Sequence, residues 1–102
     1  IRDVFRYRNL EERVRHKRKM LQQILSLFPE KKYFLLGDNT QLDLKIYLEI
    51  ARQYPANIRY IIIRKVPGRS YSESYINEIS EVLKLKGIGF YYADSFPSKF
   101  EL

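Results

Sequence analysis

Three short apolar runs, separated by longer stretches with helical periodicity, constrain the fold of this chain more than any other feature. The runs cover residues 33–37, 58–64 and 88–92, and the middle run holds the three consecutive isoleucines 61–63. β-Branched and aromatic residues favour strands, and continuous apolar runs of this length are typical of strands covered on both faces. Strands that alternate with helices form parallel sheets with right-handed crossovers. The sequence therefore predicts an α/β fold.

Helical periodicity is found in residues 10–27, 42–53 and 72–86, where apolar residues recur at spacings of three and four. The residues expected to face the core are Val14, Leu21, Ile24, Leu25 and Phe28 in the first segment, Leu44, Tyr47, Leu48 and Ala51 in the second, and Ile76, Ile79, Val82 and Leu83 in the third. Asn9 is a candidate N-cap for the first helix, and Gly87 follows the third helix at a C-cap position.

The expected organisation is one partial domain over residues 1–102: a three-layer, Rossmann-like parallel sheet with about three strands and three helices. Residues 1–9 are predicted to form a basic, extended lead-in, and residues 93–102 a tail. No apolar run approaches the roughly 20 residues that a membrane span requires. The chain has no cysteine, which excludes disulfides and thiolate metal sites and fits a reducing, cytoplasmic compartment.

The chain is basic, with 19 lysines and arginines against 12 acidic residues and a net charge of +7. The positive charge is concentrated near the start, at Arg2, Arg6, Arg8, Arg13, Arg15, Lys17, Arg18 and Lys19. Such a positive charge favours binding to polyanions, namely nucleic acid, anionic lipid or phosphorylated ligands. A solvated helix face explains the same residues equally well, so both interpretations stay open.

Asp38 and Asp43 are the candidate metal ligands. In open parallel sheets ligands bind at the carboxyl ends of the strands, and Asp38 follows the first apolar run directly. Asp43 comes five residues later, so the intervening turn can bring both carboxylates to one point. Two hard oxygen ligands suit Mg²⁺, and Gly37 would let the backbone take a tight conformation beside the ion. The alternative is that both aspartates are turn and N-cap residues.

Lys17 is the candidate catalytic residue. It lies on the first predicted helix, which precedes the Asp38 strand and should pack beside it. A lysine there could reach a phosphoryl group as a point charge. The alternative is a solvated lysine in a basic helix. The single histidine, His16, is typical of a surface or packing residue.

Taken together, these residues resemble the actin-patch-associated phosphatidate phosphatases, a branch of the haloacid dehalogenase superfamily. The resemblance covers about residues 1–66 and fades in the final third. It is carried by His16-Lys17, Ile24-Leu25, Phe28-Pro29, Tyr33-Phe34-Leu35-Leu36-Gly37-Asp38, Gln41, Asp43, Ile46-Tyr47, Ile50-Ala51, Tyr54-Pro55, Ile58 and Ile61-Ile62-Ile63-Arg64. The joint pattern is specific, although no single piece of it is.

The resemblance implies the C-terminal half of a haloacid-dehalogenase-like phosphatase domain. In that superfamily an aspartate on the first strand attacks the phosphate, and a second aspartate two residues later acts as general acid and base. A lysine that steadies the transferring charge matches Lys17, and acidic residues that bind Mg²⁺ match Asp38 and Asp43. The implied substrate is a phosphomonoester such as phosphatidate, which a protein peripheral to the membrane would bind at the membrane surface. Enzymes catalyse phosphoryl transfer mainly by holding positive charges close to the phosphoryl group, and less by covalent chemistry.

The sequence departs from the family pattern in two ways. Asn39-Thr40 stands where the family usually has Ser-Gly, and Leu44-Lys45 where it usually has Pro-Glu, so that Lys45 reverses a charge near the expected metal. These 102 residues also contain no Asp-x-Asp-x-Thr motif, so the nucleophile would lie upstream. The expectation is that this chain by itself does not turn over a phosphomonoester.

Two other functions stay open. The basic first helix could make the chain a non-catalytic module that binds nucleic acid or anionic membrane, although no base-stacking or groove-reading motif is present. The substitutions near Asp43 also fit a degenerate family member that keeps the fold for interactions only. A half-domain is further expected to expose a hydrophobic sheet edge, through which it would self-associate.

Overall fold

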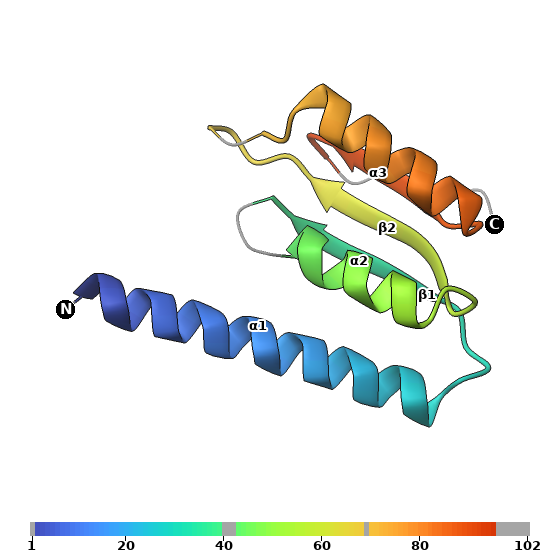
Figure 1. Ribbon diagram of the computed structural model, residues 1–102, viewed down its shortest axis with the longest axis horizontal. Helices are drawn as coiled ribbons and strands as arrows, with labels where there is room; N and C mark the ends of the chain where they lie inside the picture. The colour runs from blue at the N-terminus through green and yellow to red at the C-terminus, as the bar shows by residue number, and fades with distance from the viewer. Residues whose placement is uncertain (1, 40–42, 69, 96–102) are drawn as a thin grey trace.

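A computed structural model of the chain shows three helices and three strands in alternation (Figure 1). It describes residues 2–39, 43–68 and 70–95, with side chains from residue 11 onward. The elements are α1 (Arg2–Leu27), β1 (Tyr33–Asp38), α2 (Asp43–Gln53), β2 (Ile58–Arg64), α3 (Glu73–Leu85) and β3 (Gly89–Ala93). The predicted α/β class and the predicted order of elements are confirmed, consistent with a Rossmann-like partial domain.

The three strands form one parallel sheet in the order β1-β2-β3. Ile61 in the middle of β2 pairs with Leu35 of β1 on one side and with Phe90 of β3 on the other. At the carboxyl ends, Arg64 lies between Asp38 and Ala93. Because parallel strands end at a common edge, the residues that follow β1, β2 and β3 share one rim.

One hydrophobic core joins the sheet to the helices. Leu35, Ile61 and Ile63 point to the helices on one face of the sheet, although Ile62 on the other face of β2 is also only 1% exposed. The buried members are Leu25 from α1, Leu44, Ile46, Tyr47, Ile50 and Ala51 from α2, Ile79 and Leu83 from α3, and Leu35, Ile58, Ile61, Ile63 and Ile88 from the strands and their edges. On the opposite face Leu36 and Tyr91 remain 46% and 42% exposed. The expectation that the first strand is covered on both faces is therefore wrong for the described residues.

Helix α1 begins earlier than the sequence indicated. It starts at Arg2, so residues 2–9 are helical rather than an extended lead-in, and Asn9 lies inside the helix instead of capping it. The physical reason is that no glycine or proline precedes Pro29, so nothing interrupts the helix. α1 packs against α2 rather than against the strands. Neither α1 nor any other described helix carries an apolar stretch long enough to cross a membrane.

The other elements end close to where the sequence placed them. Ser72 caps α3 by accepting a hydrogen bond from the backbone of Tyr75, and Gly87 follows the helix with a positive φ of 74°. Three residues expected in the core are instead partly exposed, namely Ile24, Phe28 and Val82. Of the predicted tail, Ala93 belongs to β3, and residues 96–102 lie outside the described residues.

Candidate functional site at the carboxyl rim of the sheet

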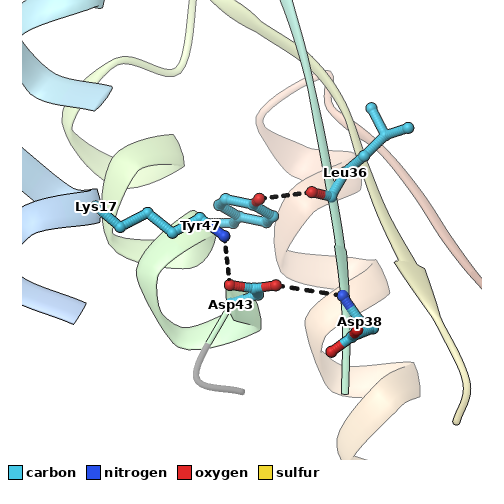
Figure 2. Close-up of polar contacts among 5 residues, drawn as sticks. All are labelled: Lys17, Leu36, Asp38, Asp43 and Tyr47. Atoms are coloured by element: carbon cyan, nitrogen blue, oxygen red, sulfur yellow. Dashed lines mark hydrogen bonds and ion pairs between the residues drawn. The ribbon is translucent and has the colours of Figure 1, made fainter. Parts of the chain in front are cut away.

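The three residues singled out from the sequence lie at the same rim of the sheet (Figure 2). Asp38 is the last residue of β1, and Asp43 is the first residue of α2. Lys17 comes from α1, and its side chain reaches Asp43 at the start of α2 (Figure 2). The packing of α1 on α2 therefore carries a side chain 26 positions away in sequence to the start of α2.

Lys17 and Asp43 are in direct contact. The Lys17 Nζ atom lies 2.5 Å from Asp43 Oδ1, and the two side chains are 33% and 9% exposed. The ammonium also stands 5.2 Å from the centre of the Tyr47 ring. Burial by itself lowers the pKa of Lys17, but the hydrogen bond to Asp43 and the neighbouring Tyr47 outweigh it, so the pKa lies above its usual value. Lys17 is therefore held as a fixed positive charge.

Asp43 also fixes the end of the neighbouring strand. Its second oxygen, Oδ2, accepts a hydrogen bond of 3.3 Å from the backbone N–H of Asp38. A carboxylate in the first turn of α2 is stabilised by the positive end of the helix dipole. The side chain thus satisfies a backbone donor of β1 and the ammonium of Lys17 at once. The side chain therefore has a structural role in joining β1 to the start of α2, and it also lies at the predicted site.

Gly37 makes room for this arrangement. A Cβ atom added at Gly37 would lie 2.6 Å from Asp43 Oδ2 and 2.8 Å from Asp43 Cβ. Contacts below 3.0 Å do not occur for real Cβ atoms, so something would have to move. The glycine is needed for the close approach of Asp43, and its φ is not positive. The sequence interpretation of a tight backbone conformation at Gly37 is corrected accordingly.

Tyr47 completes the packing around Lys17, and sequence reasoning missed its polar role. Its hydroxyl donates a hydrogen bond of 2.6 Å to the backbone carbonyl of Leu36 (Figure 2). Burial raises the pKa of the Tyr47 phenol, while the Lys17 charge opposes this shift only in part. Tyr47 is four residues after Asp43, which places both on one face of α2; that spacing was the available signal.

Asp38 is held differently from Asp43. Its carboxylate Oδ2 lies 4.0 Å from Nη2 of Arg64, the neighbouring residue on β2. The next residue, Asn39, is 7% exposed and fastens the strand end to the other two strands. Its Oδ1 accepts a hydrogen bond of 2.8 Å from Val66 N, and its Nδ2 donates one of 3.3 Å to the Tyr92 hydroxyl. Asn39 thus links the end of β1 to β3 and to the residues that follow β2.

The structure therefore brings Lys17 and Asp43 together, and joins Asp43 to Asp38 through the backbone N–H of Asp38. His16 is exposed, as expected. Within the described ranges, no three histidine, cysteine or acidic side chains are grouped so as to hold a metal ion. Gln41, which contributes to the family resemblance, lies outside those ranges. The roles assigned to Lys17, Asp38 and Asp43 remain predictions.

Comparison with known proteins places the chain in a family. Residues 2–65 match the family described as phosphatidate phosphatase APP1, catalytic domain. The phosphatidate phosphatase APP1 of Saccharomyces cerevisiae is 36% identical over 73 residues, a region that covers 65% of this chain and 12% of the yeast protein. No solved structure matches the chain. The matched region contains Lys17, Asp38 and Asp43, and the chain belongs to the APP1 catalytic-domain family.

Proposed function

We propose that this chain forms the part of a phosphatidate phosphatase-like catalytic domain that carries a phosphate-binding lysine and a magnesium site. The observation that carries the proposal is the Lys17–Asp43 ion pair at the carboxyl rim, within the region that matches the family. A fixed ammonium at such a rim is suited to a phosphoryl group, because phosphoryl transfer is accelerated chiefly by placed positive charge.

The acidic side chains at the rim provide the type of ligand atom that Mg²⁺ prefers. Asp38 and Asp43 offer hard carboxylate oxygens, and Mg²⁺ is commonly held by one or two carboxylates together with water and substrate phosphate. Two protein ligands are therefore sufficient, and this ion does not require a cluster of three histidine, cysteine or acidic side chains, of which the described residues hold none. Bound there, the cation would supply positive charge to the phosphoryl oxygens.

The residues of the chain itself would bind and orient the substrate. Lys17 is held by Asp43 and by the Tyr47 ring, so its charge is oriented before any ligand arrives. Asn39 fixes the strand end that carries Asp38. Preorganised charges cost no rearrangement when the ligand binds, which is the physical basis of their effect.

The substrate class is proposed from the relative. The yeast protein is named as a phosphatidate phosphatase, and we extend a phosphomonoester lipid substrate, met peripherally at a membrane surface, to this chain. The nucleophile would come from outside these residues, because the 102-residue sequence contains no Asp-x-Asp-x-Thr motif. We expect these residues by themselves to bind the phosphate and the metal without hydrolysis.

Isothermal titration of the chain with MgCl₂ tests the metal site. We expect a binding heat that Asp38→Asn removes and that Glu81→Gln, a substitution of an exposed acidic residue on α3, leaves unchanged. The matching activity measurement uses a protein in which a strand with Asp-x-Asp-x-Thr precedes these residues. Its hydrolysis of dioctanoyl phosphatidate should require Mg²⁺ and should be lost in Asp38→Asn. Full activity in that variant would contradict the metal role.

The structure of α1 assigns part of the basic cluster to helix packing. Lys17 and Arg18, two of the clustered cations, form ion pairs with Asp43 and Glu49 of α2 at 2.5 and 2.7 Å. Arg13, Arg15 and Lys19 are exposed, so a polyanion-binding module remains the alternative function. Binding to DNA, RNA or anionic vesicles that is strong at low salt and falls steeply with added salt would favour this alternative.

A further inference from the structure

An open cavity lies at the amino ends of the strands, at the edge of the sheet opposite to the candidate site. Its volume is about 340 Å³, far more than the roughly 30 Å³ that one water molecule takes up in the liquid. Three cations line it where the chain enters each strand: Lys32 directly before β1, Arg59 near the start of β2 and Lys86 between α3 and β3. No acidic side chain among the described residues lines this cavity.

The positive charge of the cavity is not compensated. The ion pairs within the described part of the chain lie on α1 and at the carboxyl rim, and none includes Lys32, Arg59 or Lys86. Lys32 donates a hydrogen bond to the backbone carbonyl of Ala56, which also lines the cavity. An ammonium has three N–H donors, so this contact leaves others for a ligand. Because a cleft lined by charges of one sign concentrates counter-ions, the cavity should attract anions.

An irregularity in the sheet places Arg59 at this cavity. The register between β1 and β2 passes from the pair Tyr33–Ile58 to the pair Phe34–Tyr60, so Arg59 is an extra residue on β2 with no partner on β1. Such β-bulges redirect the side chain of the extra residue, and they are frequent beside functional sites. The position of Arg59 therefore follows from a feature of the backbone and not from surface charge alone.

One wall of the cavity is formed by packing. A Cβ atom added at Gly89, the first residue of β3, would collide with the ring of Tyr60. The glycine therefore lets this ring lie directly against the start of β3. On its other side Tyr60 contacts Phe34, with 5.2 Å between the ring centres. The aromatic wall beside the cations is thus in place before a ligand binds.

The end of α3 explains one of the three cations without a ligand. Lys86 is the C-cap residue of α3, and a cation is favoured there by the helix dipole. The same dipole disfavours an anion, but the carbonyls of Leu83 and Lys84 already accept backbone hydrogen bonds from the residues that follow the helix. The dipole of α3 also gives no reason for Arg59 on β2 or for Lys32 before β1.

We propose that this cavity is a phosphate-binding site, in which Lys32, Arg59 and Lys86 hold one phosphate group. Arg59 offers a planar fork of donors that matches two phosphate oxygens, and the lysines add point charges. Arg59 lies five residues before Arg64, about 16 Å away at the usual strand rise, so the site is separate from the carboxyl rim. The inference is independent of the proposed function. The phosphate belongs either to a small phosphorylated molecule or to a lipid headgroup, which the experiment distinguishes.

The test is a titration of the ¹⁵N-labelled chain with inorganic phosphate, followed by amide chemical shifts in NMR at constant ionic strength and without Mg²⁺. We expect saturating shifts at Lys32, Arg59 and Gly89. Arg59→Gln should raise the Kd about tenfold, as expected for loss of a charge-assisted contact, and Arg59→Lys should raise it less. The control is Lys31→Gln, which removes the same charge from an exposed neighbour that does not line the cavity and should leave the Kd within about twofold.

The amide shifts separate this inference from the proposed function. Saturating shifts only at Gly37 and Asp43 would overturn the cavity site and leave the proposed function standing. Shifts that do not saturate, or equal weakening in Arg59→Gln and Lys31→Gln, would mean diffuse attraction to a positive chain and would also overturn the cavity site. The dispersion of the amide spectrum of each variant verifies that it is folded.

Co-sedimentation with phosphatidylcholine vesicles, with and without phosphatidate, identifies the source of the phosphate. If a lipid headgroup is the ligand, Arg59→Gln should reduce binding to the phosphatidate vesicles more than Lys31→Gln does. If a small phosphorylated molecule is the ligand, the two variants should bind these vesicles equally, while only Arg59→Gln binds inorganic phosphate more weakly. Either pattern supports the cavity site. Equal behaviour of the two variants in both measurements would overturn it.

Discussion

The ammonium of Lys17 meets the carboxylate of Asp43 at 2.5 Å, and the same carboxylate receives the backbone N–H of Asp38. One buried acidic side chain thereby couples three elements: α1, the start of α2 and the end of β1. The Asp43 side chain is only 9% exposed, and so buried a polar group needs the ion pair and the hydrogen bond that it has here. Removing either partner should therefore affect both stability and the predicted site.

The first prediction concerns this ion pair. Asp43→Asn should destabilise the chain by about 2 kcal/mol, because it leaves the partly buried ammonium of Lys17 without its counter-charge. Lys17→Met should cost less, because Asp43 keeps its hydrogen bond to Asp38 N. Urea unfolding of both single variants and the double variant gives the coupling energy. Strictly additive effects would contradict a direct interaction.

The second prediction concerns alkaline pH. Because the pKa of Lys17 is raised in the folded state, its stabilising contribution is complete below the unfolded-state pKa of about 10.4 and is lost as the pH rises through the folded-state value. The raised pKa of Tyr47 acts in the same direction, above about pH 10.

Urea unfolding between pH 8 and 11.5 measures this loss. The wild-type chain should lose more stability above pH 10 than Lys17→Met or Tyr47→Phe, since each variant lacks one of the two groups. If stability fell by the same amount with pH in all three proteins, the raised pKa values of Lys17 and Tyr47 would not be its cause.

The third prediction concerns Gly37. Gly37→Ala should destabilise the chain by about 1–3 kcal/mol, because its methyl group would stand 2.6 Å from Asp43 Oδ2 and displace the carboxylate. The same substitution should cost clearly less in an Asp43→Gly background, where neither the carboxylate nor the Cβ atom of residue 43 is present. Thermal unfolding of the two pairs measures the difference. An equal cost in both backgrounds would mean that the clash is not the cause.

The fourth prediction concerns the edge of the sheet. β1 is an edge strand among the described elements, and Leu36 on it is 46% exposed. Exposed apolar edge strands favour pairing with another chain, so the isolated chain should self-associate as its concentration rises. Leu36→Lys should shift sedimentation-velocity profiles toward the monomer. The control is Leu85→Lys, which alters an 88% exposed leucine on α3 and should leave association intact. A wild-type monomer at all concentrations would refute self-association.

Much of the fold could be predicted because its signals are local. The apolar run 58–64 is a strand from end to end, and Ser72 and Gly87 bound α3 as their preferences indicate. The start of α1 was misplaced because a short alternation of apolar and basic residues is typical of a strand as well as of a helix. Ile24 and Phe28 have the right spacing for a core face but are 36% and 48% exposed, whereas Leu25 beside them is only 2% exposed.

The candidate site could be predicted only as a set of residues. The positions of Lys17, Asp38 and Asp43 came from strand ends and from family resemblance, whereas their contacts depend on how α1 crosses α2. The direct contact of Lys17 with Asp43 is a tertiary relationship across 26 residues and leaves no periodic trace in the sequence. Likewise, the position of Arg64 opposite Asp38 follows from strand register, which is fixed only when the sheet forms.

The packing of α1 on α2 has a consequence for the position of Lys17. Lys17 is carried to the rim by a helix that packs on another helix, and the neighbouring Arg18–Glu49 and Gln22–Gln53 contacts join the two. A change in the angle between α1 and α2 would move the ammonium relative to the end of β1, while the sheet stays in place. Substitutions at these helix–helix contacts, which lie away from Asp38, are therefore expected to alter the position of the Lys17 charge.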